Sequence, residues 1–204
     1  TVQLHPIYNN RNLYYNSAMI SALVVDELKK NNDYRLFYFA DPAPAKTATG
    51  LKEGEMEAYA GCDVSMDYAV FSANTLKKMY SPINSRYYDN GQSEPRAILS
   101  YAEQQLILAE ARVLGWITNS AAKDYYESGV KAALAFYMAT PAAGAHGKPI
   151  TQAYMDSYFT GAAAFAATTE EQLKQIWMQR YLLGYMQPQS AFFEYRRTKY
   201  PEFP

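Results

Sequence analysis

The stretch Ser-Tyr-Ala-Glu-Gln-Gln-Leu-Ile-Leu-Ala-Glu-Ala-Arg-Val-Leu-Gly, residues 100–115, decides how this chain folds. Ser100 followed by Glu103 matches a capping box, in which each side chain accepts a hydrogen bond from a backbone N–H of the first turn. Gly115 stands where a helix commonly ends in the left-handed conformation. Between these signals, apolar residues recur at helical spacing, which predicts an amphipathic helix: Ala102, Leu106, Ile107, Ala109, Val113 and Leu114.

A second helix is predicted after a short polar turn. Asn119 or Ser120 can cap it, because both side chains can accept a hydrogen bond from the first turn. Small residues beside large aromatic ones would let the two helices approach closely, so residues 98–140 are predicted to form a helical hairpin. The inward face of the second helix is expected to hold Ala122, Tyr125, Tyr126, Gly129, Val130, Ala133, Phe136 and Tyr137.

Residues 1–97 are richer in loops. A helix is predicted from Ser17 to about Asn32, with Ile20, Leu23, Val24 and Leu28 on its apolar face. Further along, the pattern predicts an extended segment at 32–39, a helical turn within 53–59, a short helix at 74–80 and a long polar loop at 81–95. Loops of that length in a compact domain are often functional.

Residues 141–204 are predicted to hold helices and a tail. A short helix is expected at 151–158, and Thr168 with Glu171 supplies another capping box. The helix that follows places Trp177 among apolar residues, so we interpret this side chain as core. Pro188 is expected to open a last helix, because proline lacks only an N–H that is unpaired there anyway. The fold class is therefore all-α, with long irregular loops and little or no β.

Composition excludes several classes of protein. Hydrophobic residues make up 49% of the chain and charged residues 19%, which is typical of a folded domain. Nineteen basic and twenty acidic residues nearly cancel, so nothing favours nucleic acid or an anionic membrane. Cys62 is the single cysteine, and the two histidines are His5 and His146, so neither a disulfide nor a metal centre is predicted. There is no apolar run long enough to span a membrane. Since the chain begins at Thr1, we expect a processed product or a piece of a longer protein.

Glu103 and Glu110 are a candidate pair of catalytic carboxylates. Seven residues of helix separate them by roughly 10.5 Å of rise. Retaining glycosidases need about 5–5.5 Å between their carboxyl groups and inverting ones about 6.5–9.5 Å. We therefore prefer structural roles, in which Glu103 caps its helix and Glu110 forms a partly buried bidentate bond with Arg196 or Arg197. No motif for nucleophilic, metal or cofactor chemistry is present, so catalysis is not expected.

Tyrosine is unusually frequent, with twenty residues. A tyrosine ring can stack on the C–H face of a sugar, while Asn, Asp and Arg side chains can bind its hydroxyl groups. Packing or turn stabilisation is the competing explanation for each tyrosine. Two irregular stretches combine these residue types, and their candidate ligand-binding residues are Tyr8, Asn9, Asn12, Tyr14, Tyr15, Arg86, Tyr87, Tyr88, Asp89 and Asn90.

Three segments resemble one family in the same order. Residues 98–115 look like the central "AEA…G" helix of the SusD/RagB-like outer-membrane nutrient-binding lipoproteins. Residues 175–203, with Glu-Tyr-Arg-Arg-Thr-Lys-Tyr-Pro-Glu-Phe at their end, resemble the ending of that family, "Q.(W/Y)…E.RRT.yPe". Residues 24–36 are similar to its "D.L…nDPRL.yf" segment, with Tyr34 in place of the usual proline. Family members are about twice as long, so the chain resembles their C-terminal part.

The resemblance implies a mainly helical protein with TPR-like hairpins, residues 98–140 being one of them. It also implies cell-surface binding of oligosaccharide, or of peptide in some members, for delivery to a SusC-like TonB-dependent outer-membrane transporter. Family members are anchored to the outer membrane through a lipidated N-terminal cysteine, which this sequence does not contain, because Cys62 is internal. Two alternatives remain: a TPR-like protein-interaction scaffold without a small-molecule ligand, and a surface glycoside hydrolase.

Overall fold

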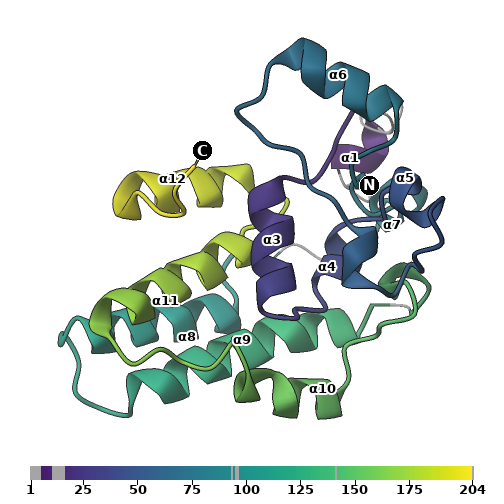
Figure 1. Cartoon of the computed structure of the whole chain (residues 1–204). Helices are drawn as coiled ribbons and strands as arrows, with labels where there is room; N and C mark the ends of the chain where they lie inside the picture. Colours follow the sequence, from purple (N-terminus) through teal and green to yellow (C-terminus); the bar gives the residue numbers. More distant parts are fainter. Residues whose placement is uncertain (1–5, 11–16, 93, 95–96, 141, 204) are drawn as a thin grey trace. The chain divides into compact units, whose positions relative to one another are not determined.

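A computed structural model describes residues 6–10, 17–92, 94, 97–140 and 142–203. Helices and turns make up this described part, and pairing between extended segments is limited to isolated bridges such as Ser21 with Cys62. The prediction of an all-α fold is confirmed. The chain divides into two compact units (Figure 1): Thr1–Arg96 with Tyr137–Ile150, and Ala97–Phe136 with Thr151–Phe203.

The first unit consists of short helices joined by long connections. They are α1 (Pro6–Asn9), α3 (Ala22–Lys30), α4 (Leu36–Phe39), α5 (Pro44–Thr47), α6 (Tyr68–Leu76) and α7 (Arg86–Asp89), with single 3-10 turns at Met56–Ala58 and Ala142–Ala145. The core of this unit is rich in aromatic residues and includes Val25, Leu28, Leu36, Phe37, Tyr38, Phe39, Tyr59 and Tyr87, each at most 1% exposed. Bulky buried rings compensate for the short helices, because each aromatic side chain buries a large apolar area.

Several predictions for the first unit were wrong in detail. The helix expected from Ser17 begins at Ala22, where Ser21 accepts a hydrogen bond from the third residue of the first turn. The segment predicted to be extended contains α4 instead. Asp33 accepts a hydrogen bond from the Arg35 N–H at 2.9 Å and starts a turn there. All four residues of α4 are buried, so their sequence carries no helical period.

The second unit contains the longer helices. They are α8 (Tyr101–Val113), α9 (Ala122–Met138, whose last two residues belong to the first unit), α10 (Gln152–Ser157), α11 (Thr169–Leu183) and α12 (Pro188–Thr198). Here the capping signals predicted the starts well. Ser100 accepts from the Glu103 N–H at 3.1 Å and Thr168 from the Glu171 N–H at 3.3 Å. Gly115 adopts a φ of 75°, as its place after α8 predicted.

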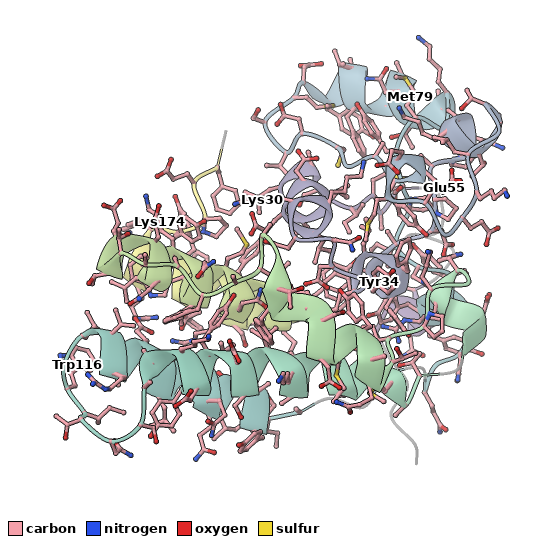
Figure 2. The ribbon with its side chains drawn as sticks, turned by 60° about the horizontal axis from the view of Figure 1, so that its bottom comes forward. Lys30, Tyr34, Glu55, Met79, Trp116 and Lys174 are labelled. Carbon is pink, nitrogen blue, oxygen red and sulfur yellow. The ribbon has the colours of Figure 1, made fainter. Side chains whose placement is uncertain are left out.

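The predicted hairpin of α8 and α9 is present, and small residues hold it together. A Cβ on Gly129 would lie 3.0 Å from the Leu106 side chain and 3.1 Å from the Ala102 carbonyl, so α9 could not approach α8 this closely with a larger residue. Trp116 extends into solvent at the turn between them (Figure 2) and is 75% exposed. In the described part of the chain, no helix combines the length and apolar character needed to cross a membrane.

Two details of α9 differ from the prediction. Neither Asn119 nor Ser120 caps it, because the helix begins at Ala122 and the Asp124 carboxylate accepts from the Ala121 N–H at 3.4 Å. Phe136 is 36% exposed, and Leu134 is the fully buried residue near that end of the helix. From Ala133, a three-residue step reaches Phe136 and a four-residue step reaches Tyr137. Both steps keep roughly to one helix face, and only Tyr137 is buried.

Candidate functional site

The structure brings the described part of the first candidate ligand-binding stretch next to the second one. Helix α1 carries Tyr8 and Asn9 and packs against α7, whose end carries Asp89 and Asn90. Asn9, Asp89 and Asn90 are exposed, and Tyr8 is half-buried. These four residues form what we call the α1–α7 surface. The other candidates of the first stretch, Asn12, Tyr14 and Tyr15, lie outside the described residues.

The remaining candidates of α7 are turned inward. Tyr87 is fully buried and Tyr88 is 5% exposed, so neither ring presents a face to a ligand. The Arg86 side chain donates to the Tyr87 hydroxyl at 2.6 Å and to the Tyr38 carbonyl at 3.1 Å, and it pairs with the Glu94 carboxylate. This arrangement favours packing, the competing explanation, for Arg86, Tyr87 and Tyr88. A buried single-turn helix leaves little periodic signal, which is why sequence alone suggested an open loop.

Two polar side chains fix the start of α7. The Asp41 carboxylate accepts from the Ser85 N–H at 3.1 and 3.0 Å. The buried Asn84 accepts from the Arg86 N–H at 2.9 Å and donates to the carbonyls of Phe37 at 2.9 Å and Gly144 at 3.0 Å. Together these bonds satisfy backbone groups that a short helix leaves unpaired. The position of α7, and with it that of the α1–α7 surface, therefore depends on this polar network.

His146 belongs to the same network. Its Nε2 lies 2.9 Å from Asp41 Oδ1, and its Nδ1 lies 3.1 Å from Glu53 Oε2. Burial by itself would lower the pKa of His146, but hydrogen bonds to Asp41 and Glu53 and the charges of both carboxylates outweigh it and raise this pKa above its ordinary value. The sequence offered no partner for His146, because its partners lie 105 and 93 residues away.

In the second unit the central charge is negative: it is the carboxylate of Glu110, which is surrounded by hydrogen-bond donors. Arg197 donates to Glu110 through two nitrogens, at 2.6 and 2.9 Å. Trp177 Nε1 donates at 2.8 Å and Arg180 at 3.0 Å. The predicted bidentate bond to Glu110 is thus formed by Arg197, while the guanidinium of Arg196 lies 5.8 Å from the Phe192 ring centre. Trp177 is only partly buried and serves as a hydrogen-bond donor as well as a packing residue.

This environment is unsuited to acid catalysis by Glu110. Burial would raise the pKa of Glu110, but hydrogen bonds from Arg197 and Trp177 and the charges of Arg197 and Arg180 outweigh it and lower the pKa below its ordinary value. A glycosidase acid needs a raised pKa so that it holds a proton at working pH. Among the described residues, no group of three or more His, Cys, Asp or Glu side chains is arranged to hold a metal ion.

Comparison with known proteins gives the family. The family model described as SusD-like, "Starch-binding associating with outer membrane", matches residues 1–204. The chain belongs to the SusD-like family. No curated protein sequence matches this SusD-like chain.

Several solved structures share the fold of this chain. A SusD homologue from Bacteroides fragilis NCTC 9343 is 35% identical, with a TM-score of 0.92 over 99% of this chain and 44% of the homologue. An outer membrane protein from Bacteroides vulgatus ATCC 8482, whose proposed role is nutrient binding, is 34% identical, with a TM-score of 0.82 over 90% of this chain and 40% of that protein. A chitin-binding protein is 29% identical, with a TM-score of 0.67 over 90% of this chain and 38% of that one. The chain thus spans less than half the length of these relatives.

Proposed function

We propose that this chain is the C-terminal part of a SusD-like protein that binds oligosaccharide without cleaving it. The observation that carries the proposal is the family match over the whole chain, to a family described as starch-binding. The similarity to a chitin-binding protein supports a carbohydrate ligand. The division into residues 1–97, 98–140 and 141–204 is part of this proposal, the middle segment being a TPR-like hairpin.

The α1–α7 surface is our candidate for contact with the sugar. Asn9, Asp89 and Asn90 place amide and carboxylate groups in solvent, and such groups can donate to and accept from sugar hydroxyls. Tyr8 adds a half-buried ring beside them. Asn12, Tyr14 and Tyr15, which follow α1 in the chain, are proposed to extend the same site.

We further propose that the complete protein works at the outer membrane. It would be held there, facing the outside of a Gram-negative cell, by a lipid anchor outside this chain, and it would deliver its ligand to a SusC-like TonB-dependent transporter. Peptide is the alternative ligand. The description of the family as associating with the outer membrane supports this location.

Calorimetry with soluble starch- and chitin-derived oligosaccharides tests the proposal against its two rivals. We expect saturable heats of binding, with the sugars recovered at unchanged length by mass spectrometry. Release of shorter sugars would instead identify a glycoside hydrolase. Absence of binding to all these oligosaccharides and to a peptide mixture would favour a protein-interaction scaffold.

A further inference from the structure

An imidazole lies between two carboxylates in the first unit, and one of these carboxylates also fixes the start of α7. The side chain of His146 is 11% exposed, that of Asp41 22% and that of Glu53 65%. The three residues come from segments far apart in the chain. His146 follows the 3-10 turn Ala142–Ala145, Asp41 follows α4, and Glu53 lies before the 3-10 turn at Met56–Ala58. The ring of His146 thus links its own segment to two others, and none of the three has regular secondary structure at these residues.

The hydrogen-bond geometry favours a protonated His146. A neutral imidazole has one N–H and one lone pair, whereas a protonated one donates from both nitrogens. Two carboxylates, which accept only, lie at 2.9 and 3.1 Å from the two nitrogens. A lone pair facing either carboxylate at such a distance would be repelled. This geometry therefore favours a ring that carries a proton on both nitrogens.

The neighbouring Asn84 does not change this conclusion. Its Nδ2 lies 3.4 Å from His146 Nε2, a contact that could suggest an imidazole lone pair accepting from the amide. The two amide protons are already donated to the Phe37 and Gly144 carbonyls, at 2.9 and 3.0 Å. Turning the amide over would place its NH2 group against the Arg86 N–H, whose hydrogen bond the Asn84 side-chain oxygen now accepts. Asn84 therefore has no proton left for the ring.

We propose that protonated His146 is a pH-dependent clamp that joins Glu53, Asp41 and the start of α7, and that this clamp opens when the ring loses its proton. The neutral ring keeps one donor, and the less exposed Asp41 retains it. Glu53 then turns into solvent, since it is the most exposed member. The bond to Asp41 changes from a charge-assisted one to a weaker neutral one.

The effect reaches α7 through a shared oxygen. Asp41 Oδ1 accepts from His146 Nε2 and also from the Ser85 N–H that precedes α7. When the ring loses its positive charge, the electron density on this carboxylate changes. The hydrogen bond from the Ser85 N–H changes as well, because it ends on the same oxygen. His146 is thus a positioning residue for the helix that carries Asp89 and Asn90.

The other charged and titratable groups near the ring do not take over the role of Asp41 and Glu53. The Tyr59 ring centre is 6.3 Å from that of His146, and burial raises the pKa of Tyr59, so it stays neutral. Lys148 Nζ lies over the Tyr34 ring at 5.7 Å. The Arg86 side chain, which runs beside Gly144, is paired with Glu94. The two carboxylates thus remain the charges that hold the protonated ring.

Nuclear magnetic resonance on the isotope-labelled chain tests the clamp without any ligand, so its outcome is independent of the proposed function. The chain has two histidines, and the variant His5→Gln leaves the signals of His146 alone. We expect nitrogen shifts of a doubly protonated ring in mildly acidic solution and a titration midpoint above the ordinary value of about 6.5. We also expect the Ser85 amide signal to titrate with the same midpoint.

Two variants serve as controls. His146→Gln should abolish the titration of the Ser85 amide. Glu53→Gln removes an exposed carboxylate and should leave the fold intact. It should lower the titration midpoint of His146. This variant therefore keeps the test decisive if His146→Gln does not fold. A His146 midpoint at or below about 6.5 would overturn the proposal, and so would a Ser85 amide that does not follow the ring.

Discussion

The two units hold buried charge in opposite ways. In the second unit, one carboxylate, Glu110, is surrounded by two arginines and an indole N–H. In the first unit, one imidazole, that of His146, is held between two carboxylates. Arginine stays protonated throughout the physiological range, whereas histidine loses its proton within it. The second unit is thus fixed by permanent charges, while the unit that carries the α1–α7 surface depends on a proton.

Removing the fixed charge should have the largest effect. Glu110→Gln leaves Arg180 and Arg197 with Glu194 as their remaining shared carboxylate, in a place where Glu110 is 7% exposed. We expect a loss of about 2 kcal/mol in the free energy of unfolding, because the charge-assisted hydrogen bonds that Arg180 and Arg197 donate to Glu110 are weakened. Urea denaturation measures it.

Glu103→Gln, on the same helix, is the matched control. It should change the free energy of unfolding by no more than about 0.5 kcal/mol, as is usual for substitutions outside the core. If Glu110→Gln proves as stable as this control, the Glu110 cluster does not fix the second unit.

The two adjacent arginines allow a finer comparison. Arg197→Lys replaces a bidentate donor by a point charge, so one of the two bonds to Glu110 is lost. We expect about 1 kcal/mol of destabilisation, the usual net value of one hydrogen bond. Arg196→Lys, which leaves those bonds in place, should cost less. Equal losses in thermal unfolding of the two variants would mean that the bidentate geometry contributes nothing.

The pH dependence of stability should separate the two units with a smaller effect. The pKa of His146 is raised by folding, so its contribution is present below the unfolded value of about 6.5 and is lost as pH rises through the folded value. The pKa of Glu110 is lowered by folding, so its contribution is present above the unfolded value and is lost as pH falls through the folded one.

Urea denaturation of the wild type and of His146→Gln across the pH range measures this difference. The stability difference between the two proteins should shrink as the solution becomes alkaline, whereas that between the wild type and Glu110→Gln should shrink in acid. A difference for His146→Gln that is the same at all pH values would show that the ring is not protonated in the folded protein.

Local signals made the second unit largely predictable from sequence. Ser100, Thr168 and Gly115 act within one turn of their own helix, so their roles can be read from spacing alone. The bond between Glu110 and Arg197 spans 87 residues. The sequence predicted Arg196 or Arg197 as the partner of Glu110, and only the structure decides between these two adjacent arginines.

The first unit was less predictable, for physical reasons. In α4 every residue is buried, so no alternation of apolar and polar residues indicates a helix. The partners of His146 come from irregular segments, and no local pattern reports contacts between such segments. Tyr87 and Tyr88 were candidates for an open loop because sequence does not distinguish a buried tyrosine from an exposed one.

The most direct test of the central claim, that the α1–α7 surface of the first unit binds sugar, is calorimetry with an oligosaccharide that binds the wild-type chain. The double variant Asn9→Ala with Asp89→Ala removes one exposed polar group from each helix. Its affinity should fall about tenfold or more, since each lost hydrogen bond costs about 1 kcal/mol. Glu170→Ala with Lys174→Ala, an exposed pair on α11 of the second unit, should leave the affinity unchanged. An unchanged affinity in the first double variant would contradict the account and place the sugar elsewhere.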